Sequence, residues 1–109
     1  MEHYEIIMTP DAIKDLSDLR NYVADVLLAR ETALKLIRYI RDEISKLSEM
    51  PGRIKPMDDE PWKSRGVRRL LCKNFYVYYR IDEDAKRVYV LSVIYARREQ
   101  LNALSDKQD

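Results

Sequence analysis

Hydrophobic and polar positions divide the first half of the chain into one short strand and two helices. Residues 4–8, YEIIM, form a β-branched run that ends at Thr9-Pro10, where threonine can cap a helix and proline suits its first turn. Apolar residues then recur every three or four positions over residues 11–28 and again over residues 30–49. These stripes predict two helices, and Met50-Pro51-Gly52 ends the second. Because almost no loop separates them, we expect an antiparallel hairpin laid on a sheet.

The second half contains one segment rich in helix and strand breakers, followed by three strand-like runs. Residues 51–66 hold three prolines and two glycines without a helical or strand period, which predicts a long loop. Residues 67–72, 75–82 and 87–95 are strand-like and are separated by turns short enough for hairpins. The sequence therefore predicts one α+β domain over residues 1–109. Its expected elements are an N-terminal strand, a two-helix antiparallel hairpin and a three-stranded antiparallel meander, forming a small sheet covered by the helices.

Composition limits the classes of protein without choosing a function. The chain is 46% hydrophobic and 36% charged, which favours a folded core under an ionised surface over disorder. Twenty Lys and Arg residues oppose nineteen Asp and Glu residues, so a nucleic-acid site would have to be a local patch. One cysteine excludes an internal disulfide, and from the residues given we expect neither a signal sequence nor a membrane span. We expect a cytoplasmic protein without membrane association.

The chain offers little material for metal-dependent or triad catalysis. His3 and Cys72 are its only histidine and cysteine, too few for a zinc site or a nucleophile–base pair. Two glycines are too few for a glycine-rich phosphate loop. The run Asp58-Asp59-Glu60 offers carboxylate ligands for a divalent cation, but adjacent acids on a loop usually only solvate it. We therefore expect neither a metal nor a cofactor.

Basic and aromatic residues are concentrated in the last third of the chain. The basic ones are Lys63, Arg65, Arg68, Arg69, Lys73, Arg80, Lys86, Arg87, Arg97 and Arg98, and the aromatic ones are Trp62, Phe75, Tyr76, Tyr78, Tyr79, Tyr89 and Tyr95. Interleaved in this way, they can present guanidinium groups to phosphates and rings to unstacked bases. The alternative is structural, with tyrosines half-buried in strands and arginines paired with acids on the helices. Composition leaves both interpretations open.

Several sequence motifs follow one another in a characteristic order. They are YEIIMTPDAIKDL at the start, the Pro51-Gly52-Arg53 loop, GVRRL at 66–70, FYVYYRI at 75–81 and VYVLSVIYARR at 88–98. In combination they resemble the RelE/ParE family of toxins from type II toxin–antitoxin systems, over nearly the whole chain. The resemblance implies a small cytoplasmic α+β toxin that a cognate antitoxin neutralises.

The RelE-like branch of that family implies a metal-independent, ribosome-dependent mRNA endonuclease that arrests translation, and this is the activity that we expect from the sequence. In such enzymes cations stabilise the crowded phosphate while the RNA 2′-hydroxyl attacks it. By resemblance, Arg69 on the first meander strand and Arg97 at the end of the last strand are catalytic. Tyr76 occupies the place of a catalytic arginine, and Tyr95 lies near the place of a histidine found in some relatives. The C-terminal tyrosine of RelE-like toxins has no counterpart near Asn102.

The resemblance thus gives two sets of candidate site residues. The catalytic set is Arg69, Tyr76, Tyr95 and Arg97, and the substrate-binding set is Lys63, Arg65, Arg68 and Arg98. We expect the arginines to converge on one phosphate, on one exposed concave face of the sheet. The tyrosines are expected to stack on a base or move a proton there.

The ParE-like branch implies a different activity, inhibition of DNA gyrase by binding. It shares the helix hairpin, the Arg-Arg strand and the aromatic-x-Arg-Arg ending without a nuclease constellation, and the sequence fits it about as well. A third alternative is a family member with neither activity. The expected partners are therefore a cognate antitoxin together with either the ribosome and mRNA or DNA gyrase. The antitoxin is expected to lay an amphipathic segment on the helices or to add a strand to a free sheet edge.

Overall fold

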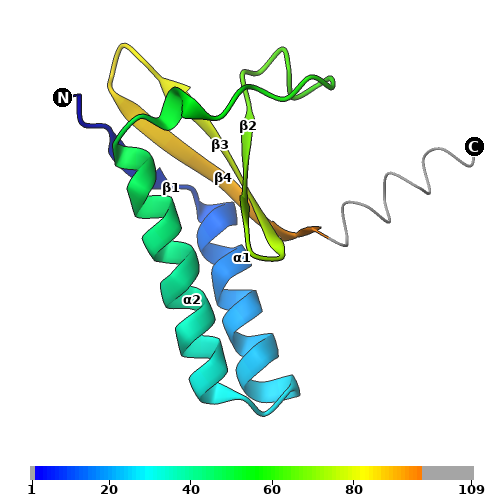
Figure 1. Ribbon diagram of the computed structural model, residues 1–109. Coiled ribbons are helices and arrows are strands. Elements are labelled where there is room, and N and C mark those ends of the chain that lie inside the picture. The colour runs from blue at the N-terminus through cyan, green and yellow to red at the C-terminus, as the bar shows by residue number, and fades with distance from the viewer. Residues whose placement is uncertain (1, 97–109) are drawn as a thin grey trace, which may run out of the picture.

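Two helices cover one face of a four-stranded sheet, as Figure 1 shows for the computed structural model, in which residues 2–96 are described. In chain order the elements are β1 (Glu5–Met8), α1 (Pro10–Asn21), a π-helical turn (Tyr22–Val26), α2 (Arg30–Ser45), two 3₁₀ turns (Lys46–Ser48 and Pro51–Arg53), β2 (Arg68–Cys72), β3 (Phe75–Asp82) and β4 (Arg87–Tyr95). The predicted α+β fold is confirmed. None of the described helices is long and apolar enough to cross a bilayer.

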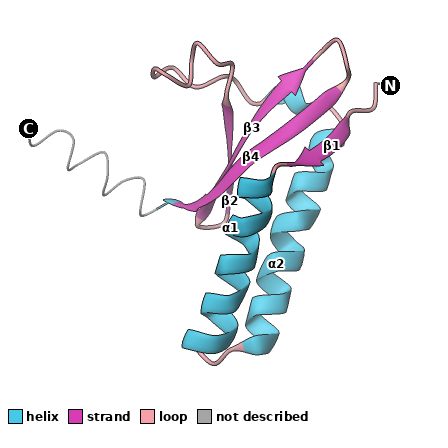
Figure 2. Ribbon diagram, turned by 180° about the vertical axis from the view of Figure 1, so that it is seen from behind, coloured by secondary structure: helices cyan, strands magenta, loops and turns pink. Residues whose placement is uncertain are grey.

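The sheet is mixed and has the order β1-β4-β3-β2. Strands β2, β3 and β4 form the predicted antiparallel meander. Strand β1 lies parallel to β4, with Glu5 opposite Arg87 and Met8 opposite Val90. Figure 2 shows this contact from behind, with β1 at one side of the sheet and the helix hairpin extending away from it. The first and last strands of the chain are therefore neighbours.

Local sequence signals set where the first helix begins but not where it ends. The Thr9 hydroxyl accepts a hydrogen bond from the Ala12 N–H at 3.3 Å, and Pro10 opens the helix, as expected. The prediction of one regular helix to residue 28 is wrong in its last turns. The helix widens to a π turn at Tyr22–Val26, and Leu28 takes a left-handed conformation with φ 53°. Beyond Val23 the apolar stripe has no sheet to pack on, so packing no longer maintains a regular helix.

The core lies between the hairpin and the sheet. Its larger cluster consists of Ala12, Leu16, Ile37, Ile40, Ile44, Cys72, Val77, Val90 and Val93. A smaller cluster of Tyr4, Leu47, Tyr79 and Val88 closes the end of the sheet nearest the N-terminus. Burial of these side chains holds the helices on one face of the sheet, and no helix of residues 2–96 lies on the other face.

An irregularity in β4 affects which residues reach each face. The β3–β4 register shifts between Tyr78 and Tyr79, so β4 carries one extra residue, Leu91. The Thr9 hydroxyl donates to the Val90 carbonyl at 2.7 Å, and an Asp15 carboxylate oxygen accepts from the Val93 N–H at 2.9 Å. Side chains at the start of α1 therefore satisfy backbone groups of β4 on either side of this bulge.

Candidate functional site

The sheet face turned away from α1 and α2, called the open face here, carries most of the candidate residues of β2 and β3. Side chains alternate along a strand, and Val77 and Tyr79 point into the helix-covered core. Their neighbours Tyr76, Tyr78 and Arg80 therefore point to the open face. Cross-strand pairing brings Arg69 to the same face, opposite Tyr78. The structure thus places Arg69 and Tyr76 together, as the sequence predicted.

Two arginine–tyrosine stacks lie on the open face. The Arg69 guanidinium lies 4.0 Å from the centre of the Tyr76 ring, and the Arg80 guanidinium lies 4.3 Å from the centre of the Tyr89 ring. A guanidinium stacked on a ring keeps its charge and the donors at its edge. The face can therefore offer planar cations to an anionic or π-rich partner.

The segment between α2 and β2 covers part of the open face. Trp62 packs on Tyr78, with ring centres 6.0 Å apart, and Tyr78 is buried although it points away from the helices. Backbone hydrogen bonds fix this segment, among them Val67 N–H to the Trp62 carbonyl at 3.0 Å. Lys63 and Arg65 are exposed on the same segment, next to Trp62. They thus lie at the border of the open face.

Arg68 has a different environment from Arg69. Its guanidinium donates to the Gly52 carbonyl at 3.4 Å and to the Ile54 carbonyl. From the adjacent strand, the Tyr79 hydroxyl donates to the Pro51 carbonyl at 2.7 Å. Arg68 therefore holds the 3₁₀ turn Pro51–Arg53, and its donors are directed at backbone oxygens. It lies opposite buried Tyr79, on the other face of the sheet from Arg69, so the expectation that these two arginines converge on one phosphate is wrong.

Tyr95 does not share the open face with Arg69 and Tyr76, so the expected convergence of these three residues is wrong. It lies opposite Phe75, with ring centres 5.5 Å apart, and Phe75 packs against the helix-covered core. The bulge at Leu91 is the physical reason, because one extra residue moves every later side chain of β4 to the other face. Arg97 and Arg98 lie outside the described residues.

A second candidate surface, called the hairpin groove here, lies between α1, α2 and β1. It has a volume of about 630 Å³ and is lined by Ile6, Met8, Ile13, Leu16, Ser17, Arg20, Ile37, Arg41, Ile44 and Ser45. Its lining is mostly apolar, with Arg20 and Arg41 as its charged members. Sequence reasoning missed these two arginines, although Arg20 follows Ile13 by seven positions and Arg41 follows Ile37 by four, the spacing of one helix face.

Other chemistry is sparse among the described residues. No group of three or more His, Cys, Asp or Glu side chains comes together there in a way that would hold a metal ion. Cys72 is buried in the core, and burial raises the pKa of its thiol. The candidate site is therefore a surface of cations and rings rather than a pocket of reactive groups.

Comparison with known families decides the class of the protein. The family model described as the ParE toxin of type II toxin–antitoxin systems, parDE, matches residues 6–100. The chain belongs to the ParE toxin family. The match covers β1, the helix hairpin and the whole meander, so it rests on the entire fold.

Several solved toxin structures have a fold similar to that of this ParE family member. A chain of the chromosomal ParDE system from P. aeruginosa matches with a TM-score of 0.71 at 22% identity, over 87% of this chain and 98% of that one. A chain of the toxin–antitoxin complex RelBE2 from Mycobacterium tuberculosis gives 0.59 at 22%, over 85% and 98%. A mutant of the E. coli toxin RelE in the free state gives 0.62 at 14%, over 97% of both chains. No curated protein matches the sequence.

These findings confirm the resemblance drawn from the motifs and make the chain a toxin of a type II toxin–antitoxin system. At such low identity the ParE and RelE structures establish the shared fold alone. The shared fold therefore does not identify the target of this ParE family member, which depends on its own surface residues.

Proposed function

We propose that this ParE family toxin acts by binding its target, DNA gyrase, rather than by cutting RNA. The observation that carries the proposal is the match of residues 6–100 to the ParE toxin model, the branch whose resemblance implies gyrase inhibition. General acid–base cleavage needs a proton-transfer group and phosphate-binding cations within hydrogen-bond reach of the same phosphate. Tyr95 lies on the opposite face of the sheet from the Arg69–Tyr76 stack, which leaves the stack with one fewer candidate for that group and supports the proposal.

A direct comparison of the two activities tests this proposal. We expect the purified full-length toxin to inhibit gyrase supercoiling and to leave mRNA intact in a translating extract. Arg69→Ala should weaken the inhibition because it removes a guanidinium from the open face, whereas Arg38→Ala, an exposed position on α2, should not. Intact supercoiling together with codon-position cuts in the message would overturn the proposal.

Ribosome-dependent mRNA cleavage is the second candidate, supported by the Arg69–Tyr76 stack itself. Tyr76 is half-buried beside a guanidinium, and Lys63 and Arg65 are exposed on the neighbouring segment. In this alternative Arg69 and Arg97 stabilise the phosphate, Tyr76 moves the proton, and Lys63, Arg65 and Arg98 contribute substrate contacts. Primer extension should then show cuts that disappear in Arg69→Ala and Arg97→Ala.

We further propose that the cognate antitoxin binds the hairpin groove through an acidic amphipathic segment. The groove has an apolar floor, Arg20 and Arg41 in its lining, and the outermost strand β1 beside it. Apolar side chains of the segment would fill the floor while its carboxylates pair with the arginines.

Induced expression of the toxin alone should arrest bacterial growth, and co-expression of the neighbouring gene should restore it. Unimpeded growth with folded toxin present would contradict the growth-arresting activity on which this partnership rests.

A further inference from the structure

The end of the helix hairpin farthest from the sheet exposes apolar side chains that the fold does not use. This hairpin tip consists of the π turn Tyr22–Val26, the link 27–29 and the first turns of α2 (Figure 1). Its exposed apolar residues are Tyr22, Val26, Leu27, Leu28 and Leu34. Val26 and Leu27 continue the stripe that packs α1 on the sheet, but the sheet does not extend this far. The gathering of five exposed apolar side chains at one end of the hairpin favours an interaction site there.

Leu28 is the most exposed of these residues and has an unfavourable backbone. Its side chain is 84% exposed, and its φ of 53° lies in the left-handed region that leucine seldom adopts. Glycine would fit this position without strain and without exposing a butyl group. Backbone strain of this kind is concentrated at functional sites. Within the folded chain, leucine is therefore a less favourable residue here than glycine.

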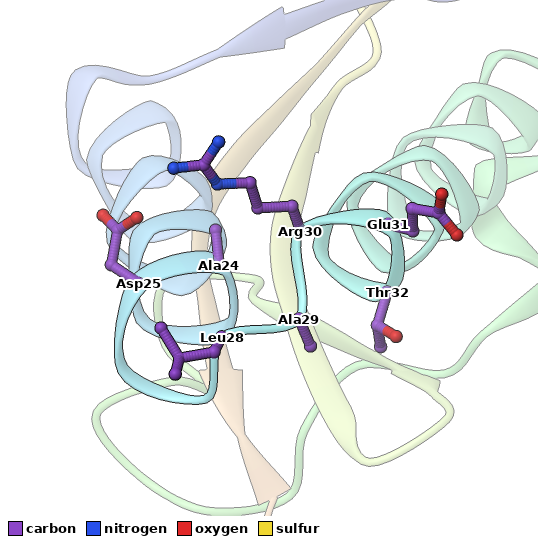
Figure 3. Close-up of a pocket in the computed structure, with 7 residues that line it drawn as sticks. All are labelled: Ala24, Asp25, Leu28, Ala29, Arg30, Glu31 and Thr32. Carbon is purple, nitrogen blue, oxygen red and sulfur yellow. The ribbon is translucent and has the colours of Figure 1, made fainter.

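Charges of both signs lie around Leu28 without an ion-pair partner among residues 2–96. Figure 3 shows a shallow pocket of about 540 Å³ at the tip, lined by Asp25, Arg30 and Glu31 together with Ala24, Leu28, Ala29 and Thr32. Arg30 extends toward α1, while Glu31 lies on the α2 side. Among residues 2–96, none of these three charged side chains forms an ion pair.

We propose that the hairpin tip is a self-association surface that binds the tip of a second copy of this chain about a two-fold axis. In a two-fold contact the same patch meets itself, so a patch of a single charge sign would repel its copy. The tip instead presents Arg30 beside Asp25 and Glu31, and each Arg30 can face a carboxylate of the other copy. Leu28 of each copy fills the apolar centre. This inference goes beyond the proposed function and does not depend on it.

Sedimentation of the full chain over a range of concentrations tests the association itself. We expect a monomer–dimer equilibrium, which Leu28→Gly weakens by about a hundredfold or more, because each copy in the dimer loses a buried leucine side chain. Glycine relieves the strain at this position, so loss of association cannot be attributed to misfolding, and circular dichroism verifies the fold. Met50→Gly is the matched control, because Met50 is also exposed, has φ 50°, and lies beyond the opposite end of α2.

A charge exchange tests the geometry. Arg30→Glu and the double variant Asp25→Arg, Glu31→Arg should each fail to self-associate, and mixing the two should restore a heterodimer that salt weakens. A chain that is monomeric at every concentration would overturn the proposal. So would a dimer that survives Leu28→Gly unchanged, or one that is lost in Leu71→Ser, which would place the contact at the exposed edge strand β2 instead.

Discussion

The hydroxyl of Tyr79 shows how single side chains order a segment that has little regular structure. Tyr79 is fully buried, and burial raises the pKa of its hydroxyl, so the group remains a neutral donor to the Pro51 carbonyl. Arg68 holds the next carbonyls, Gly52 and Ile54, from the neighbouring strand. Two side chains of the sheet thus fix the path of the chain as it leaves α2 and begins to cross toward the open face.

Removing this hydroxyl should destabilise the fold even though the aromatic ring stays in the core. We expect Tyr79→Phe to lower the free energy of unfolding by about 1–3 kcal/mol, because the Pro51 carbonyl loses its donor in a buried setting. Urea unfolding monitored by circular dichroism measures the change. Tyr95→Phe is the matched control, since Tyr95 is exposed, and its stability should remain within about 0.5 kcal/mol. Equal effects of the two substitutions would show that the Pro51 contact contributes nothing.

The contact of helix α1 with the bulge in β4 determines which candidate side chains lie on each face of the sheet. Asp15 and Thr9 supply the hydrogen bonds that the strands cannot make around Leu91. The bulge in turn directs Tyr95 toward the helices and leaves Tyr76 on the open face. The first turns of a helix therefore influence which side chains of a distant strand can act together.

Asp15→Ala should destabilise the chain by about 1–3 kcal/mol, because the Val93 N–H is left without an acceptor next to the core. Asp15→Asn keeps an acceptor oxygen at the same place and should recover most of the loss. Thermal and urea unfolding of the three proteins provide the measurement. If alanine and asparagine were equally destabilising, charge rather than the hydrogen bond would explain the role of Asp15.

The sequence predicted the elements well, since their signals are local. Thr9-Pro10 marked the start of α1, and residues 75–82 were correctly predicted as a strand, in which alternation puts Tyr76 and Val77 on opposite faces. The remaining features depend on distant parts of the chain. The burial of Tyr78 depends on Trp62, and the face of Tyr95 depends on a bulge held by α1. For the candidate site, the pairing of Arg69 with Tyr76 was therefore predictable, whereas the exclusion of Tyr95 was not.

At the scale of the molecule, a polar cluster joins the N-terminal strand to the turn between β3 and β4. The Tyr4 hydroxyl donates to Glu83 at 2.9 Å, and the Lys86 ammonium lies 3.3 Å from both Glu83 and Glu2. The Tyr4 hydroxyl and the Lys86 ammonium lower the pKa of Glu83 below its ordinary value of 4.5. The same hydrogen bond to Glu83 raises the pKa of Tyr4 above 10.0. The cluster is therefore complete only when Glu83 is ionised and Tyr4 is neutral.

This cluster should give the stability a defined dependence on pH. Because the pKa of Glu83 is lowered on folding, its contribution is present above pH 4.5 and is lost as the pH falls through the lowered value. Because the pKa of Tyr4 is raised on folding above 10.0, its contribution to stability is present below that value and is lost as the pH rises through the raised pKa. Urea midpoints of the native chain and Glu83→Gln should differ between these limits and converge in acid. Asp84→Asn, in the same turn, should not show this convergence; a pH-independent difference for Glu83→Gln would contradict the assignment.

The hairpin groove leads to a prediction about the antitoxin. Arg41→Glu, and Arg20→Glu in the same way, should weaken antitoxin binding by about tenfold or more, since each puts an anion where an acidic segment binds. Arg38→Glu is the control, because Arg38 is exposed on α2 but does not line the groove. Calorimetric titration at low and high salt measures the effect, which salt should reduce. If Arg38→Glu and Arg41→Glu weakened antitoxin binding equally, the effect would come from the net charge of the toxin and not from contacts in the groove.

The parallel pairing of β1 with β4 also fixes when during synthesis the groove can exist. The ribosome releases β1 first and β4 last, and 79 residues separate Tyr4 from its partner Glu83. Until β4 has emerged, no strand holds Ile6 and Met8 in the groove, because β1 has no other neighbour in the sheet. A nascent chain thus forms the hairpin groove, the surface proposed to bind the antitoxin, only after β4 has emerged. Neutralisation of a newly made toxin through this groove then begins only after that point, and it favours an antitoxin that has already accumulated.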